Sequence, residues 1–131
     1  MTLPMITGLY AGVLGIALFL LDAKIGSMRG KLGISVYDGG NKDLGLAIRQ
    51  HGNFTEHVPM VLILLALVEM NGVPGWAMHA MGAALVVARV VHFIGLDADK
   101  MGTKGRTIGA VGSGLVSIVA AVWLIYIFIT T

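Results

Sequence analysis

Residues 58–88 read VPMVLILLALVEMNGVPGWAMHAMGAALVVA, two apolar runs separated by the short segment 71–75. The Asn-Gly and Pro-Gly pairs of that segment are strong turn signals. Each run, extended by its flanking residues, is long enough to cross a hydrocarbon core of about 30 Å, which takes around 20 helical residues. Because the link is so short, the two helices must run antiparallel. The stretch therefore predicts a membrane-spanning helical hairpin.

The composition of the whole chain agrees with this prediction. Of its 131 residues, 56% are hydrophobic and 12% are charged, and the mean hydropathy is +0.87. Soluble domains have roughly 45–50% apolar and about 25% charged residues. The absence of cysteine excludes disulfides and thiolate sites. The net charge of +2 is too small and dispersed for a nucleic-acid surface. An integral membrane protein remains.

Charge-free stretches locate two further helices. Residues 2–21 and 107–131 contain no Asp, Glu, Lys or Arg, and neither do residues 70–88 of the hairpin. The first helix of the hairpin, residues 44–70, is mostly apolar and long enough to span, although it includes Arg49, Glu56 and Glu69. We expect a single all-α domain, residues 1–131, with four transmembrane helices at about 2–23, 44–70, 75–96 and 106–130.

Loop cations predict the orientation. The loop after the first span holds Lys24, Arg29, Lys31 and Lys42, and the loop after the third holds Lys100, Lys104 and Arg106. The link at 71–75 and both termini hold no Lys or Arg. Since cytoplasmic loops carry the excess of Lys and Arg, both termini are expected on the non-cytoplasmic side.

Polar residues inside the second and third spans are the most informative feature. Arg49, Asn53 and Glu56 share one face of the second helix, and Arg89 and His92 share one face of the third. The hairpin places both groups at the same end of the membrane. An ionised side chain near mid-bilayer costs roughly 2.5–3.5 kcal/mol on insertion scales, so charged residues within a span usually pair or face a wet cavity.

Two interpretations of this cluster stay open at this point. In one, Arg89 pairs with Glu56 or Glu69 and the cluster only joins helices. In the other, the surplus donors hold an anionic ligand that enters from the cytoplasm. We expect Glu69, near the opposite end of the second span, to lie at the membrane interface. The four histidines are too scattered for a metal site, and none is predicted.

The motif Arg49-Gln-His-Gly-Asn53-Phe-Thr-Glu56-His57-Val-Pro59 resembles that of the MAPEG family, the membrane-associated proteins of eicosanoid and glutathione metabolism. The family pattern is Arg, three residues, Asn, two residues, Glu, usually Tyr, one residue, Pro. The segment Ala88-Arg89-Val-Val-His92-Phe-Ile-Gly95 resembles the family's Ala-Arg-x-x-Tyr/His-x-x-Gly. Asp38-Gly39-Gly40 and Glu69-Met-Asn-Gly72 are most similar to the small bacterial members. The resemblance covers nearly the whole chain.

The resemblance implies a left-handed four-helix bundle that assembles as a homotrimer, with glutathione bound between subunits near the cytoplasmic face. It assigns glutathione binding to Arg49, Asn53, Glu56, His57, Arg89 and His92. Arginines suit the two carboxylates of this tripeptide, and Glu56 suits its ammonium group. The chain departs from the pattern at His57 and Leu96, where the family usually has aromatic residues.

The resemblance also implies a cation that activates the glutathione thiol. A thiol with a pKa near 8.5 is only about 3% ionised at pH 7. A fixed cation that stabilises the thiolate by roughly 2.7 kcal/mol would make most of it nucleophilic. Arg106, near the start of the fourth span, is the catalytic candidate. Its alternative role is that of a cytoplasmic anchor.

The resemblance to small bacterial members therefore implies a glutathione S-transferase or peroxidase of a bacterial inner membrane. Its partners would be the lipid bilayer, glutathione as co-substrate and a lipophilic electrophile or lipid hydroperoxide. The alternative is a catalytically silent, lipid-binding or accessory subunit of a larger membrane complex that has the same fold. A transporter or channel ranks third, because the chain shows no inverted repeat.

Overall fold

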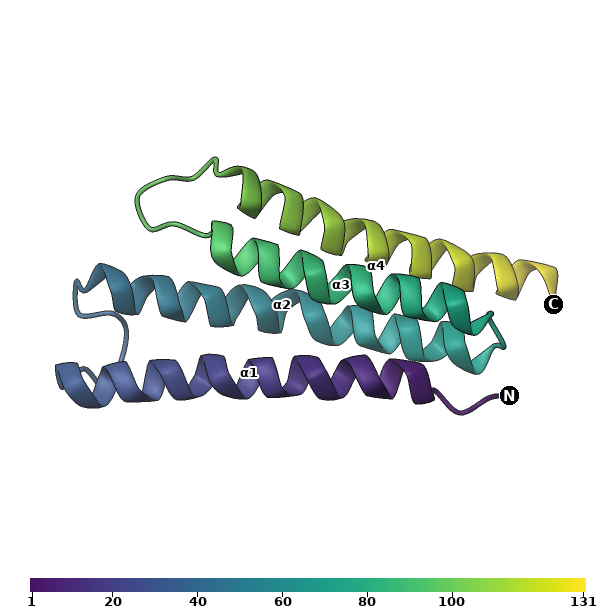
Figure 1. Ribbon diagram of the computed structural model, residues 1–131, viewed down its shortest axis with the longest axis horizontal. Helices are drawn as coiled ribbons and strands as arrows, with labels where there is room; N and C mark the ends of the chain where they lie inside the picture. The colour runs from purple at the N-terminus through teal and green to yellow at the C-terminus, as the bar shows by residue number, and fades with distance from the viewer.

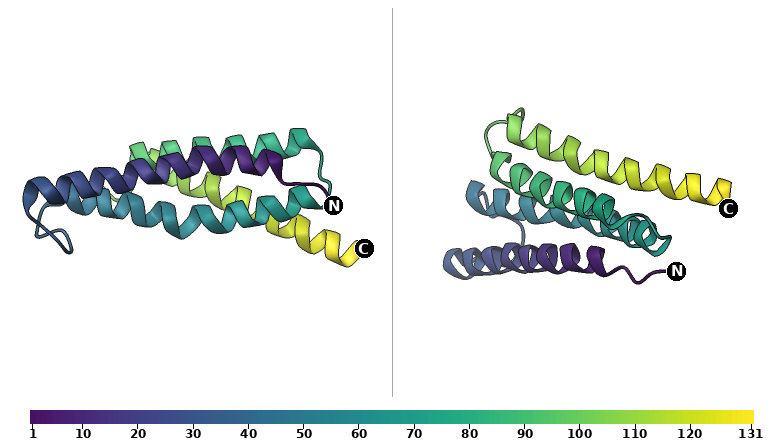
Figure 2. Two further views of the ribbon diagram at one scale, coloured as in Figure 1. Left: turned by 90° about the horizontal axis from the view of Figure 1, so that it is seen from below. Right: turned by 45° about the vertical axis from the view of Figure 1, so that its right-hand side comes forward.

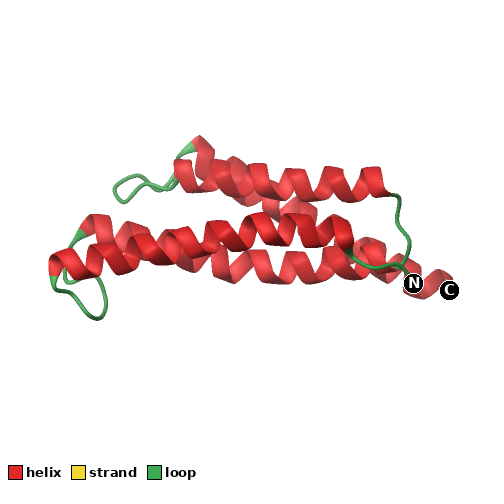
Figure 3. Cartoon of the chain, turned by 60° about the horizontal axis from the view of Figure 1, so that its bottom comes forward, coloured by secondary structure: helices red, strands yellow, loops and turns green.

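The computed structural model describes residues 1–131 as four α-helices and no strands. They are α1 (Met5–Leu32), α2 (Lys42–Met70), α3 (Gly75–Gly95) and α4 (Lys104–Thr130), and all regular structure in Figure 3 is helical. Each helix is long and apolar enough to cross a membrane. The predicted all-α, four-helix membrane bundle is confirmed.

The helices run up and down, and the two ends of the bundle differ. Both chain termini and the short α2–α3 link lie at one end, and the two longer loops, 33–41 and 96–103, lie at the other (Figure 1). Helices α2 and α3 form the middle of the bundle, because α1 and α4 each contact both of them but not each other (Figure 2). The basic segments therefore share one end, which we call the loop end.

The sequence accounts for most helix boundaries. The Asn41 side chain accepts a hydrogen bond from the N–H of Leu44 and caps α2, and the Thr103 hydroxyl does the same for Arg106 at the start of α4. Gly33, with φ of 67°, ends α1 in the left-handed conformation that glycine adopts without strain.

Helix α1 is longer than the sequence indicated. The predicted span ended at residue 23, whereas α1 continues to Leu32. The expected span measured only the charge-free, membrane-buried part. Beyond it the helix continues at the loop end, where Arg29 and Lys31 in its last turn interact favourably with the helix dipole. The boundaries of α2, α3 and α4 at the loop end differ from the prediction by two residues or fewer.

The core lies between α2 and α3 and thins toward the outer helices. The largest fully buried side chains are Leu44, Leu65, Val68, Met78 and Leu85, which all belong to α2 and α3. By contrast, α1 and α4 expose many large apolar side chains. This distribution fits helices whose outer faces meet lipid rather than water.

Glycines allow α3 and α4 to approach closely at the loop end. A methyl group on Gly109 would collide with the Cβ of His92 and the carbonyl oxygen of Ala88. Gly105 packs equally closely against the backbone of Gly95. Small residues serve this purpose in membrane helices. Gly8 and Gly12 of α1 have the same spacing, but a methyl group on either would meet nothing within 4 Å in the single chain.

Glu69, which the sequence places near the membrane interface, lies in the last turn of α2 and is buried. It is 6% exposed, and its carboxylate accepts hydrogen bonds from the backbone N–H groups of Ile6 (2.8 Å) and Thr7 (2.7 Å). The first N–H groups of a helix lack partners inside the helix. Glu69 of α2 therefore caps α1, which explains why a carboxylate is buried there.

Candidate functional site

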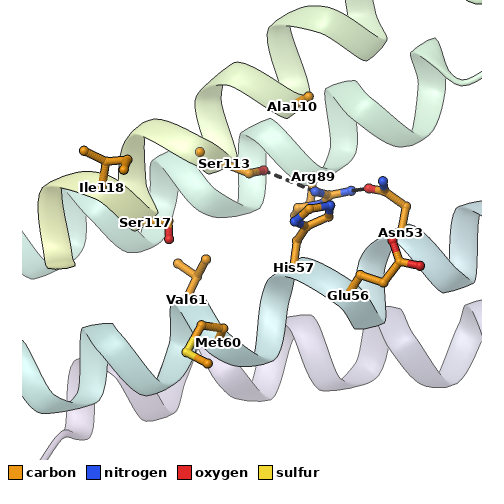
Figure 4. Close-up of a pocket in the computed structure, with 11 residues that line it drawn as sticks. Asn53, Glu56, His57, Met60, Val61, Arg89, Ala110, Ser113, Ser117 and Ile118 are labelled. Atoms are coloured by element: carbon orange, nitrogen blue, oxygen red, sulfur yellow. Dashed lines mark hydrogen bonds between the residues drawn. The ribbon is translucent and has the colours of Figure 1, made fainter.

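A cavity of about 370 Å³ opens between α2, α3 and α4 (Figure 4). Its walls combine polar side chains toward the loop end with apolar ones deeper in the membrane. The lining residues are Asn53, Glu56, His57, Met60, Val61, Arg89, Ala110, Ser113, Gly114, Ser117 and Ile118. Four of the seven residues predicted for the site, namely Asn53, Glu56, His57 and Arg89, therefore line one cavity.

Arg89 is the centre of this cavity. It lies on α3 and is 6% exposed. Its Nη2 donates to the Asn53 Oδ1 at 2.6 Å, and its Nη1 donates to the Ser113 Oγ at 3.3 Å. The buried Nε has no partner in the protein. The guanidinium thus joins α2, α3 and α4 through two neutral groups.

No carboxylate neutralises Arg89. The interpretation in which Arg89 pairs with Glu56 or Glu69 is wrong, because Glu56 pairs with Arg49 and Glu69 caps α1. A buried charge without a counter-ion is costly. The cavity therefore carries an uncompensated positive charge, and an anion that entered it would lower the free energy of the site.

Arg49 and Glu56 form an ion pair along one face of α2. The Nη2–Oε2 distance is 2.7 Å and the Nη1–Oε1 distance is 3.2 Å. Both side chains are 54% exposed on the single chain. Each of them is therefore accessible to a ligand that offers it a better partner.

The other predicted residues lie outside the cavity. His92 is buried where α3 packs on α4, against Gly109. Arg106 lies on a second hollow at the loop end, of about 380 Å³, which Arg49 also lines. Its guanidinium donates to the carbonyl oxygen of Met101 at 2.9 Å. Within one chain, Arg49 and Arg106 therefore share a site that is distinct from the Arg89 cavity.

Carboxylates balance the charge of this second hollow. Asp97, in the α3–α4 loop, accepts hydrogen bonds from the backbone N–H groups of Asp99 and Lys100. These bonds hold the pKa of the Asp97 carboxyl below its usual range. Lys42 pairs with Asp99 at 2.6 Å and ties the start of α2 to the same loop.

Sequence reasoning missed the contribution of α4. Ser113 and Ser117 line the cavity, and Ser113 also donates to the carbonyl oxygen of Gly109 at 3.0 Å. The available signal was two serines four residues apart, and so on one face, in an otherwise apolar helix.

Comparisons with known proteins agree with the architecture. The model of the MAPEG family matches residues 7–126. The inner membrane protein YecN of Escherichia coli strain K12 is 33% identical over 91 residues, which cover 70% of each chain. The YecN of Escherichia coli strain O6:H1 gives the same identity and coverage. No solved structure matches the chain significantly.

Proposed function

Because the chain belongs to the MAPEG family, whose members include membrane enzymes of glutathione metabolism, we propose that it is a glutathione-dependent transferase or peroxidase of the inner membrane. It acts on lipophilic electrophiles or lipid hydroperoxides that reach it from the bilayer. The homotrimeric assembly and the position of both termini outside the cytoplasm are part of this proposal.

The observation that supports the proposal most is the uncompensated charge of Arg89. A buried guanidinium with neutral partners and a free Nε suits an anionic ligand. Glutathione has two carboxylates, an ammonium group and a thiol that ionises. Arginines bind carboxylates through paired, charge-assisted hydrogen bonds. In this proposal Arg89 and Arg49 bind the two carboxylates of glutathione. Glu56 then releases Arg49 and binds the ammonium group of glutathione instead.

The shape of the cavity supports a lipophilic second substrate. Met60, Val61 and Ile118 form its deeper wall, and Met60 and Ile118 are more than half exposed to the membrane side. An apolar molecule dissolved in the bilayer can therefore reach the polar wall without entering water. The proposal places the thiol between Arg89 and this apolar wall.

The chemistry requires a thiolate. In the transferase reaction its sulfur attacks the electrophilic carbon, a C–S bond forms, and the leaving group departs with the bonding electrons. In the peroxidase reaction the sulfur attacks a peroxide oxygen, the O–O bond breaks, and the alkoxide takes a proton. A second glutathione then converts the oxidised sulfur to a disulfide and water. A nearby cation lowers the pKa of the thiol.

Arg106 is our candidate for that cation, and His92 and His57 remain candidates for contacts with the peptide. In a single chain Arg106 faces the second hollow rather than the Arg89 cavity. Its role therefore depends on a site that spans both hollows, which Arg49 connects because it lines one and pairs with Glu56 of the other.

Turnover by the purified full chain tests this function. With glutathione and a chromogenic aryl halide, or a lipid hydroperoxide, we expect product formation that depends on both substrates. Arg106→Ala should lower kcat more than it raises KM, whereas Lys104→Ala, an exposed cation two residues away, should change neither. Absence of turnover with both substrate classes would favour the accessory-subunit alternative.

The ion pair between Arg49 and Glu56 is the observation that favours that alternative. If the pair stays closed in the presence of glutathione, two of the proposed ligand groups satisfy each other. The protein would then retain the four-helix scaffold without the reaction. Binding of glutathione distinguishes the two functions even when no suitable electrophile is known.

A further inference from the structure

An apolar groove, which shares only Arg89 with the Arg89 cavity, runs between α1 and α3. Its volume is about 280 Å³, and nine of its ten lining residues are hydrophobic. The lining residues are Val13, Leu14, Ala17, Leu20, Leu21, Phe54, Val86, Arg89, Val90 and Phe93. Leu14 and Phe54 form a buried floor, and Val13, Leu20 and Val90 stand exposed along its walls.

A lysine closes the groove at the loop end. The Lys24 Nζ lies 5.5 Å from the centre of the Phe93 ring, at the end of the groove. Gln50 fixes this arrangement, since its Oε1 accepts from the Lys24 Nζ at 3.5 Å and its Nε2 donates to the carbonyl oxygen of Phe93 at 3.2 Å. Three helices therefore meet around the ammonium group.

Lys24 has no acidic partner. The nearest carboxylate along α1, that of Asp22, binds the His51 Nε2 at 2.7 Å. No acidic residue lines the groove. The positive charge is therefore free to attract an anion, and the neutral amide of Gln50 does not compensate it.

The depth of the groove in the membrane identifies the kind of anion. The charge-free run 2–21 ends at Asp22, so Lys24 lies where the hydrocarbon core gives way to the headgroups. From Val13 to Lys24 the helix rises roughly 16 Å. That length is about half of a 30 Å core, the depth of one leaflet. An acyl chain fits the apolar part while its headgroup reaches Lys24.

We propose that the groove between α1 and α3 binds an anionic phospholipid of the loop-end leaflet. One acyl chain lies along the groove, and the phosphate contacts the ammonium group of Lys24. Basic side chains at the cytoplasmic side of gaps between membrane helices favour anionic headgroups. Apart from Arg89, which lines both sites, the groove uses residues that the proposed glutathione reaction does not need.

Photolabelling of the full chain in nanodiscs tests the proposal. The probe is phosphatidylglycerol that carries a diazirine in its acyl chain, and the labelled peptides are mapped by mass spectrometry. We expect labels concentrated on residues 13–21 and 86–93. Lys24→Ala should reduce this labelling about fivefold, the effect of about 1 kcal/mol for one cation near the headgroups. Lys31→Ala, exposed at the same end, should not.

A second variant and a second lipid keep the test decisive. Ala17→Phe fills the groove without changing the charge and should also abolish the labelling, and the melting temperature of each variant shows that it is folded. Phosphatidylcholine with the same diazirine should label the groove weakly and without dependence on Lys24. Equal labelling of the exposed α4 residues Val111 and Leu115, which line neither the groove nor the Arg89 cavity, or no loss in Lys24→Ala, would overturn the proposal. If neither lipid labels the groove, the proposal is also overturned, and a second copy of the chain is the alternative occupant.

Discussion

At the residue scale, two carboxylates of the same helix behave in opposite ways. Glu69 is buried and caps another helix. Glu56, which lies closer to the loop end, is half exposed and pairs with Arg49 of its own helix. Their sequence contexts do not reveal this difference. It arises because the first N–H groups of α1 lie beside the end of α2, where a negative charge satisfies two orphan donors.

Glu69→Gln should therefore destabilise the protein more than Glu56→Gln does. We expect a loss of about 1–3 kcal/mol for Glu69, because two buried hydrogen bonds to a charged group become weaker. For Glu56 we expect a smaller loss, because its carboxylate is half exposed and makes no contact that holds one helix to another. Denaturant unfolding of both variants in the same detergent measures the difference. Equal losses would show that the cap contributes little.

Asn53→Ala tests the support of Arg89. The Asn53 Oδ1 is the shorter of the two contacts that hold the guanidinium. Removal of one hydrogen bond to a buried charged group should cost about 1.5–3 kcal/mol. Asn71→Ala, which removes an exposed bond to the Leu67 carbonyl, serves as the control. Thermal unfolding measures both, and an Asn53 loss no greater than that of Asn71 would contradict the assigned role.

At the element scale, the packing of α3 on α4 depends on Gly109. Gly109→Ala should destabilise the protein by about 1–3 kcal/mol, because the new methyl group would overpack the contact with His92 and Ala88. Gly114→Ala, at a position of the same helix with open space around it, should be tolerated. Unfolding in detergent compares the two. Similar stabilities would mean that α4 can shift outward without penalty.

Helices, their order and most boundaries could be predicted from the sequence, because charge-free runs and turn residues determine them directly. The hairpin alone predicted that Asn53 and Arg89 lie at the same membrane depth, but not that they form a hydrogen bond. The roles of Ser113 and Glu69 could not be predicted, since they depend on how α4 and α1 lie against α2 and α3. The end of α1 at Leu32 could not be predicted either, because the last part of this helix lies beyond the charge-free run that marks the span.

At the scale of the whole molecule, the distribution of cations predicts the orientation. The two longer loops should face the cytoplasm, and the termini and the link 71–75 should face the other side. The chain contains no cysteine, so a maleimide can react only with a cysteine that is introduced by mutation. Gly102→Cys should react with an impermeant maleimide only in inverted vesicles, and Asn71→Cys only in right-side-out cells. The reverse pattern would contradict the assigned orientation.

The central claim is that the cavity around Arg89 holds glutathione. The most direct test is the melting temperature of the full chain in detergent with and without millimolar glutathione, because a ligand that binds the folded state raises it. We predict a rise that Lys31→Ala retains and that Arg89→Gln, which removes the charge but keeps an amide donor, abolishes. An unchanged melting temperature of the unmodified protein at saturating glutathione would contradict the account.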